Sequence, residues 1–331
     1  MKTIIKQSAL ALSVVAALGM TSIANAQSNV EGKLEIKTEI GKGGIVNLST
    51  GKESTAEAAI NTIEKSNLKG DVSMNLKMGK DGIVNLATGE KSKALLDVNA
   101  IKNSTVNDAV INTEIEGGGI VNLATGQEST ASAGIGSITN TNMNGGKIEL
   151  NTRIDDGGVV NLATGKSSTA ALLISSMKGS KGSGNISANT EIGKGAVVNL
   201  ATGESSMADL LISSVRDSEV DGNVAINTKI GNAGIVNLAT GKSSKALASI
   251  GGITNGSKIG AGADVNLNTD IEGAIVNLAT GETSTASLMV STISASEVSG
   301  KVDVDTQIEG AIVNLATGEK SNSGLSIGSV K

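Results

Sequence analysis

One octet, Gly-Ile-Val-Asn-Leu-Ala-Thr-Gly or a close variant, occurs eight times in the chain, with copies 37 to 40 residues apart. A period this regular indicates stacked structural units, each of which buries its apolar side chains with the help of its neighbours. The central asparagines of the octets are Asn47, Asn85, Asn122, Asn161, Asn199, Asn237, Asn277 and Asn314.

Each repeat reads as strands. Residues 224–230, VAINTKI, alternate apolar or Thr positions with mostly polar ones, which is typical of a strand with one buried face. The octet follows as a second strand, with Val236 and Leu238 on one face and Asn237 on the other. A third segment, such as 208–215, could be helical by itself. Its short length, its β-branched and Ser residues and the strands on both sides favour a strand.

We therefore predict an all-β fold, a β-solenoid of stacked parallel, in-register β-layers, with about one layer of three short strands per repeat. Residues 27–331 form a single repeat domain under this prediction. Its eight imperfect repeats span approximately 31–68, 69–105, 106–143, 144–181, 182–219, 220–259, 260–297 and 298–331.

Equivalent positions in successive repeats support one layer per repeat rather than two. The residue after the Thr of the first segment alternates in charge, and opposite charges on adjacent layers avoid repulsion at the roughly 4.8 Å spacing of strands. This charge column comprises Glu39, Lys77, Glu114, Arg153, Glu191, Lys229 and Asp270.

Stacked asparagines can form a ladder in which each side-chain amide donates to one neighbour and accepts from the other. The octet asparagines are predicted to form one such structural ladder, and the position before the Thr supplies a second Asn column. That column comprises Asn75, Asn112, Asn151, Asn189, Asn227 and Asn268. The octets end in corner glycines, which supply the positive φ of a tight corner. These are Gly51, Gly89, Gly126, Gly165, Gly203, Gly241, Gly281 and Gly318.

The composition excludes several classes of function. The chain has no His, Cys, Pro, Trp, Tyr or Phe, and its net charge is -5. It therefore lacks an imidazole base, a thiolate nucleophile, the usual zinc ligands and the aromatic rings that stack on bases. We predict no enzyme activity, no catalytic residue, no metal or cofactor site and no nucleic-acid partner.

The N-terminus has the features of a secretory signal peptide, residues 1–26. Lys2 and Lys6 precede an apolar run, and Ala24-Asn25-Ala26 provides a cleavage site before Gln27. No other apolar run approaches the about 20 residues of a membrane helix. The sequence thus predicts a secreted protein that does not span a membrane.

The Gly-Val-Asn-apolar-Ala-x-Gly pattern, the repeat length and the scarcity of aromatics resemble the Fap-type functional amyloid subunits that Gram-negative bacteria export into biofilm. The resemblance covers residues 31–331, and curli-like repeat proteins are a more distant comparison. It implies a biofilm fibril subunit that leaves the cell through an outer-membrane secretion pore and assembles outside, on the cell surface or in the biofilm matrix. A nucleator subunit is a further possible partner.

Three functions are compatible with these observations. The favoured one is a self-assembling extracellular fibril subunit, whose main partner is itself as a homopolymer. The alternative is a discrete β-solenoid adhesin or surface-layer protein that binds glycans or host surfaces. An exported polysaccharide-active enzyme is least favoured, because no convergent acid, base or aromatic platform is visible. For the fibril, we expect end-to-end docking of repeats that buries Val, Ile and Leu positions.

Overall fold

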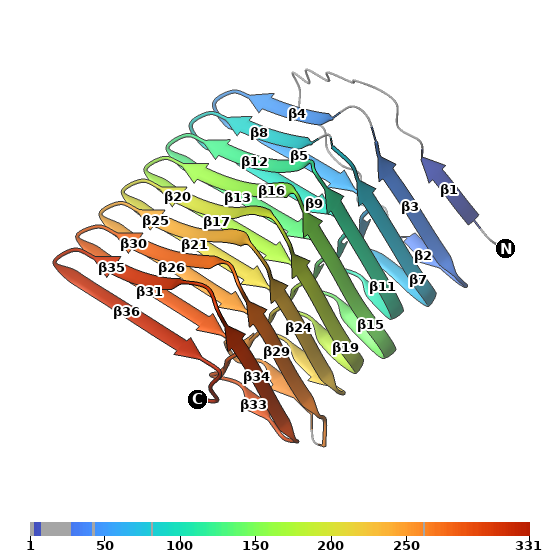
Figure 1. Cartoon of the computed structure of the whole chain (residues 1–331). Coiled ribbons are helices and arrows are strands. Elements are labelled where there is room, and N and C mark those ends of the chain that lie inside the picture. Colours follow the sequence, from blue (N-terminus) through green and yellow to red (C-terminus); the bar gives the residue numbers. More distant parts are fainter. Residues whose placement is uncertain (1–2, 8–27, 42–43, 81, 261) are drawn as a thin grey trace.

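The computed structural model describes residues 3–7, 28–41, 44–80, 82–260 and 262–331. Most of the predicted signal peptide lies outside these residues, so its predicted cleavage site is not described. The described residues form strands, turns and bends without a helix, which confirms the all-β prediction. Figure 1 shows the strands stacked in parallel into one column, with the first octet strand at one end and the last at the other.

The chain winds through four parallel sheets, A, B, C and D, in that order within each turn. Sheet A contains the segments with the VAINTKI pattern together with the residues that precede them. Its 13 strands are β1 (Thr3–Gln7), β2 (Ser28–Val30), β3 (Leu34–Ile40), β7 (Ser66–Met78), β11 (Thr105–Glu116), β15 (Asn142–Asp155), β19 (Lys181–Ile192), β23 (Glu219–Asp221), β24 (Val224–Ile230), β28 (Lys258–Ile259), β29 (Val265–Ile271), β33 (Glu297–Val298) and β34 (Val302–Ile308).

Sheets B and C each contain one strand per turn. The octets make sheet B, with strands β4 (Ile45–Thr50), β8 (Ile83–Thr88), β12 (Gly119–Thr125), β16 (Gly157–Thr164), β20 (Gly195–Thr202), β25 (Ala233–Thr240), β30 (Ala274–Thr280) and β35 (Ile312–Thr317). The third segments make sheet C, with strands β5 (Thr55–Ile60), β9 (Lys93–Val98), β13 (Glu128–Ile135), β17 (Ser167–Ile174), β21 (Ser205–Ile212), β26 (Ser243–Ile250), β31 (Thr283–Val290) and β36 (Lys320–Ile327).

Sheet D is a fourth element that the sequence analysis missed. Its two-residue strands are β6 (Ile63–Glu64), β10 (Ile101–Lys102), β14 (Ile138–Thr139), β18 (Met177–Lys178), β22 (Val215–Arg216), β27 (Ile253–Thr254) and β32 (Ile293–Ser294). Strands this short carry no readable alternation. A positive-φ residue follows sheet C in each turn, as at Asn99 and Gly136, and turns the chain into sheet D.

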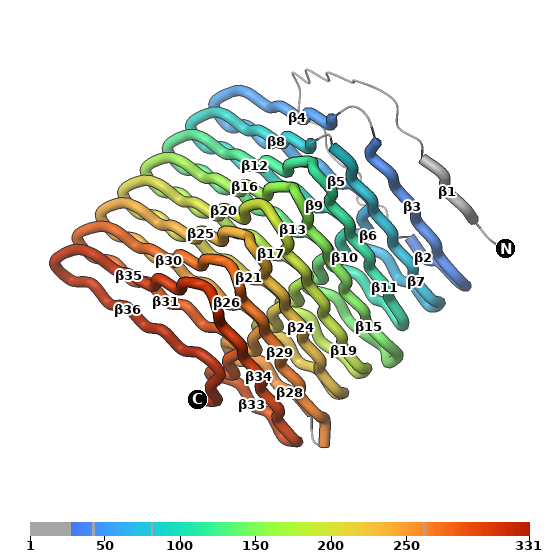
Figure 2. Tube along the Cα trace, viewed as in Figure 1, coloured from blue at the N-terminus to red at the C-terminus, as the bar shows by residue number. Residues whose placement is uncertain are grey.

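One repeat makes one turn, as predicted. Equivalent residues pair directly, so that Asn122 lies beside Asn161 in sheet B and Thr113 lies beside Thr152 in sheet A. Some differences in repeat length are absorbed inside sheet A, as where the register shifts between Val106 and Ala109. The path of the chain in Figure 2 shows successive turns stacked on one another along the whole column.

The interior contains three apolar regions. Ile and Leu side chains from sheets A, B and C form one cluster, which includes Ile115, Ile120 and Ile135. A second cluster joins the first part of sheet A to sheet D, as at Ile111 and Ile138. At the narrow end, the apolar side chains between sheets B and C are alanines, so these two sheets approach closely.

At the corner between sheets C and D, acidic side chains on the outer face of sheet C form ion pairs with basic side chains of sheet D. Arg216 Nη1 lies 2.5 Å from Asp209 Oδ1, and both side chains are almost fully buried. In another turn, Lys102 Nζ lies 3.1 Å from Asp97 Oδ2. Burial by itself would lower the pKa of Lys102, but Asp97, assisted by Glu64 and Glu57, outweighs it and raises that pKa.

Candidate functional site

The octet asparagines lie inside the solenoid and form one continuous ladder. Each Nδ2 donates to Oδ1 of the asparagine in the next turn, over seven bonds of 2.7 to 2.9 Å from Asn47 to Asn314. Asn161 also donates to the backbone oxygens of Ala131 and Ala171 in sheet C, at 3.1 and 3.0 Å. The ladder therefore ties sheet B to sheet C where only small side chains separate them.

The octet strands place Asn, not Val and Leu, on the inner face of sheet B. In β8, Ile83, Asn85 and Ala87 face inward and are buried, whereas Val84 and Leu86 face outward and are only half-buried. The predicted division of the octet, with Val and Leu on one face and Asn on the other, is confirmed, and the Asn face is the inner one. Both alternating sets of octet positions contain aliphatic residues, so alternation alone could not identify the inner one.

The outward residues of sheet B form a surface that we call the octet face. It consists of one column of Gly or Ala and columns of Val, Leu and Thr, with no charged residue in any of the eight copies. The Val column is Val46, Val84, Val121, Val160, Val198, Val236, Val276 and Val313. The Leu column is Leu48, Leu86, Leu123, Leu162, Leu200, Leu238, Leu278 and Leu315. The sequence analysis did not identify this face.

The second Asn column lies on the outer face of sheet A. Four amide-to-amide bonds of 2.8 Å link Asn75 through Asn227, and here each Nδ2 donates to the preceding turn. Asn268 lies in register with Asn227, but no side-chain bond joins them in the described part of the chain. At the ends of the column, Lys37 lies beside Asn75 and Asp305 lies beside Asn268.

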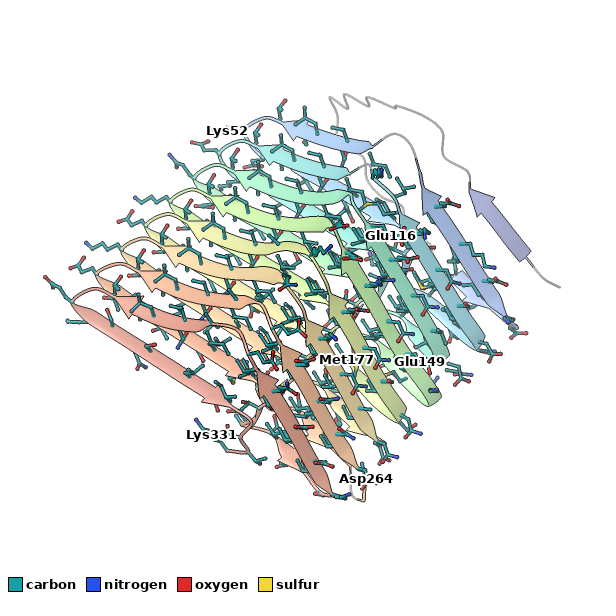
Figure 3. All side chains as sticks on the ribbon, viewed as in Figure 1. Lys52, Glu116, Glu149, Met177, Asp264 and Lys331 are labelled. Atoms are coloured by element: carbon teal, nitrogen blue, oxygen red, sulfur yellow. The ribbon has the colours of Figure 1, made fainter. Side chains whose placement is uncertain are left out.

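The charge column runs next to the outer Asn column, and each of its cations meets the acid of the following turn. Lys77 lies 3.2 Å from Glu114, Arg153 lies 3.8 Å from Glu191, and Lys229 lies 4.0 Å from Asp270. Stick side chains cover this face in Figure 3, where Glu116 is labelled at the end of its sheet A strand.

Within the charge column, Lys77 interacts with two carboxylates, those of Glu114 and Glu116. Hydrogen bonds to Glu116 and Glu114 raise the pKa of Lys77, and the hydrogen bond from Lys77 lowers the pKa of Glu116 below its usual 4.5. Because the pKa of Glu116 is lower in the folded state, the pair contributes its full stabilisation above the usual pKa of the carboxyl group. This contribution is lost as the pH falls through the lowered pKa. Both side chains are exposed, so the pairing adds little to stability.

The outer Asn column and the charge column line a shallow groove of about 790 Å³. It extends along the stack from Lys37 and Glu39 to Asn268 and Asp270. Its walls carry amides and charges of both signs over several successive turns. Within the described residues, no group of His, Cys, Asp or Glu is arranged to hold a metal ion.

Glycines and serines define the corner between sheets B and C. All eight corner glycines have φ between 143° and 154°. A Cβ on Gly165 would collide with the carbonyl oxygen of Gly126 in the preceding turn, whereas a Cβ on Gly51 meets no atom within 4 Å. The nearby serines bond the next turn rather than their own corner, as Ser168 does to the oxygen of Thr202 at 2.9 Å.

Both ends of the stack carry strands with one free edge. In sheets B and C, β4 and β5 end one side and β35 and β36 end the other, and no other described strand pairs with their outer edges. In sheet A, β1 lies along β3. None of the described residues belongs to a helix long and apolar enough to cross a membrane.

Comparisons with models of protein families, with curated proteins and with solved structures find no match for this chain.

Proposed function

We propose that this protein is a secreted, self-assembling subunit of an extracellular fibril, which grows by stacking the last turn of one copy on the first turn of the next. The observation that carries the proposal is that these two turns complement one another at several hydrogen-bonding and charged positions. After removal of residues 1–26, which include the β1 strand that lies along β3, such a fibril would extend the parallel hydrogen bonding of every sheet, as in cross-β assemblies.

The hydrogen-bonding groups of the two end turns are complementary. Asn314 is the last acceptor of the inner ladder, and its Nδ2 has no following asparagine and donates to Ser323 Oγ at 3.0 Å and to the oxygen of Gly324 at 2.8 Å. At the other end, Asn47 Oδ1 accepts no ladder bond from any described residue. Ser321, which has no following turn to bond, turns back to the oxygen of Gly318 at 2.8 Å. In a stacked pair, Asn314 would donate to Asn47 and Ser321 to the oxygen of Thr50 in the next copy.

The charges of the end turns are complementary as well. Stacking would place Asp305 beside Lys37, Glu319 beside Lys52, and Lys320 beside Glu53 of the next copy. Figure 3 shows Lys52 at the tip of the first turn. Neighbours of the same kind already pair within the chain, as Lys166 and Glu204 do at 3.3 Å.

Other junction contacts are neutral or unfavourable. Gln307 would meet Glu39 without repulsion. Asp303 and Glu35 would be a like-charged pair, but Lys37 lies 2.7 Å from Glu35 and offsets it. Exposed pairs contribute little affinity individually, so we assign them mainly to the choice of register and direction.

The end-to-end contact is tested by reversing charges at one end at a time. The D305K/E319K variant places two lysines against Lys37 and Lys52 of its own copies, and the K37E/K52E variant opposes acids in the same way. We expect each variant alone to form few filaments in electron micrographs. An equimolar mixture should restore the filaments, because the last turn of each variant then meets the oppositely charged first turn of the other variant.

The wild-type protein is the positive control, and its filaments should give a fibre-diffraction reflection near about 4.7 Å. Wild-type protein that stays monodisperse at high concentration contradicts the fibril proposal. Filaments that form equally well from each variant alone contradict this head-to-tail junction.

The groove on sheet A supports a second candidate function, a discrete surface adhesin that binds an extended glycan. The groove extends over several turns and presents amides, but no described residue supplies an aromatic stacking platform. Binding of soluble glycans by a protein that remains monomeric would favour this candidate over the fibril.

A further inference from the structure

The octet face is the most uniform outer surface of the molecule. Val and Leu occupy it in all eight turns, whereas outward positions of sheet C change from turn to turn, as at the equivalent residues Ser132, Ala171 and Asp209. The outer face of sheet C thus varies between repeats, whereas the outer face of sheet B does not. An outward side chain has no interior packing to preserve, so this uniformity points to a contact outside the chain.

The exposed atoms of the octet face are apolar. At the ends of the stack, where one neighbour is missing, Val46 is 49% exposed and Leu48 is 44% exposed. In the intervening turns the same columns are half-buried by stacking alone, and no other described element covers them. A continuous apolar surface of this size is typical of an interaction site.

The size of the face matches a stable protein interface. Eight layers at about 4.8 Å and strands of about 20 Å give roughly 760 Å² per copy. Two such faces together bury about 1,500 Å², which lies within the usual range of about 1,200 to 2,000 Å² for specific interfaces. The face lacks charge, so a second copy brings no like-charge repulsion.

We infer that the octet face is a pairing surface for a second copy of this chain, so that two solenoids lie side by side. A two-fold axis parallel to the stack sets the Val column of one copy against the Leu column of the other. The same axis sets the Gly or Ala column against the Thr column, so the smallest side chains of one face meet the Thr side chains of the other. The result is a dry, interdigitated contact between two sheets.

This lateral pairing goes beyond the proposed end-to-end stacking and does not require it. It leaves the free edges of β4 and β35 available, since the octet face runs along the stack and these edges lie at its two ends. Two paired solenoids would also present two adjacent end turns at each end of a growing fibril, onto which further copies would stack.

The test uses the D305K/E319K background, in which end-to-end stacking is opposed, and measures mass by analytical ultracentrifugation. We expect this background to sediment with twice the mass of one chain. Adding L162E and L200E should reduce the mass to that of one chain, because it places carboxylates in the centre of the octet face.

The matched control adds T169E and M207E to the same background. These changes introduce two stacked carboxylates in the same two turns, but on the outer face of sheet C, and the dimer should persist. Circular dichroism verifies that each variant keeps its strand content.

A background that sediments as a single chain overturns the inference, whatever the wild-type protein does. A dimer that survives L162E and L200E also overturns it, because another face then forms the contact. Wild-type protein that forms this dimer without filaments would refute the fibril proposal and leave the lateral pairing intact.

Discussion

Asn161 illustrates how one residue type serves two different environments in this fold. Its amide is buried in the inner ladder and serves two backbone oxygens of sheet C in addition to the next asparagine. Asn151, on the outer face of the same turn, bonds mainly along its column and remains half-exposed. The inner asparagines therefore hold the fold together, while the outer ones are available to the groove.

Replacement of Asn122, Asn161 and Asn199 by Asp should unfold the middle of the solenoid. Each change removes the donor of a buried network and stacks carboxylates in a dry interior, at a cost of at least about 3 kcal/mol per site. The matched change of Asn112, Asn151 and Asn189 to Asp, in the same turns on the outer face, should cost about 1 kcal/mol or less per site. Urea unfolding of both variants measures the difference, and equal losses would contradict the structural role of the inner ladder.

At the scale of elements, the corners between strands decide how closely turns can stack. The corner glycines leave no space for a side chain between turns, because the carbonyl of the preceding glycine occupies the position of a Cβ. Gly51 is the exception, since no described turn precedes it. In the proposed fibril, the carbonyl of Gly318 from the neighbouring copy would fill that space.

The Gly51→Ala variant should therefore keep its fold and lose its ability to stack. An alanine at φ 150° is strained by about 1 to 3 kcal/mol but collides with nothing within one copy. Gly256→Ala, at φ 74° and also without neighbours within 4 Å, is the control for strain away from the ends. Thermal unfolding and filament formation are measured for both. Filaments of normal yield from Gly51→Ala would argue against stacking at this end.

For the whole molecule, the alternation of charge along the stack sets which turns can be neighbours. Deleting residues 182–219 removes one turn and brings Arg153 beside Lys229 and Lys166 beside Lys242. Deleting residues 182–258 removes two turns and brings Arg153 beside Asp270 and Lys166 beside Glu282. The two-turn deletion thus preserves the alternation, although it removes more of the core.

These two deletions should respond to salt in opposite directions. Added salt screens repulsion between exposed charges, so the midpoint of thermal unfolding should rise for the one-turn deletion and fall slightly for the two-turn deletion. Each exposed pair contributes only about 0.2 to 1 kcal/mol, so the sign of the response is the readout. Responses of the same sign would show that the charge columns do not govern the choice of neighbouring turns.

The sequence by itself determined the solenoid, the one-turn period and the residues that stack. Strict repetition requires equivalent positions to meet, and alternation along segments such as residues 224–230 distinguishes the two faces of a strand. Only the tertiary structure decided that Asn85 faces inward while Val84 and Leu86 face outward. Ile83, Val84 and Leu86 are all apolar, and the choice depends on the close approach of sheets B and C, which admits an amide and alanines between them. The short sheet D and the contact between Arg216 and Asp209 likewise depend on a bend between sheets, which local periodicity does not encode.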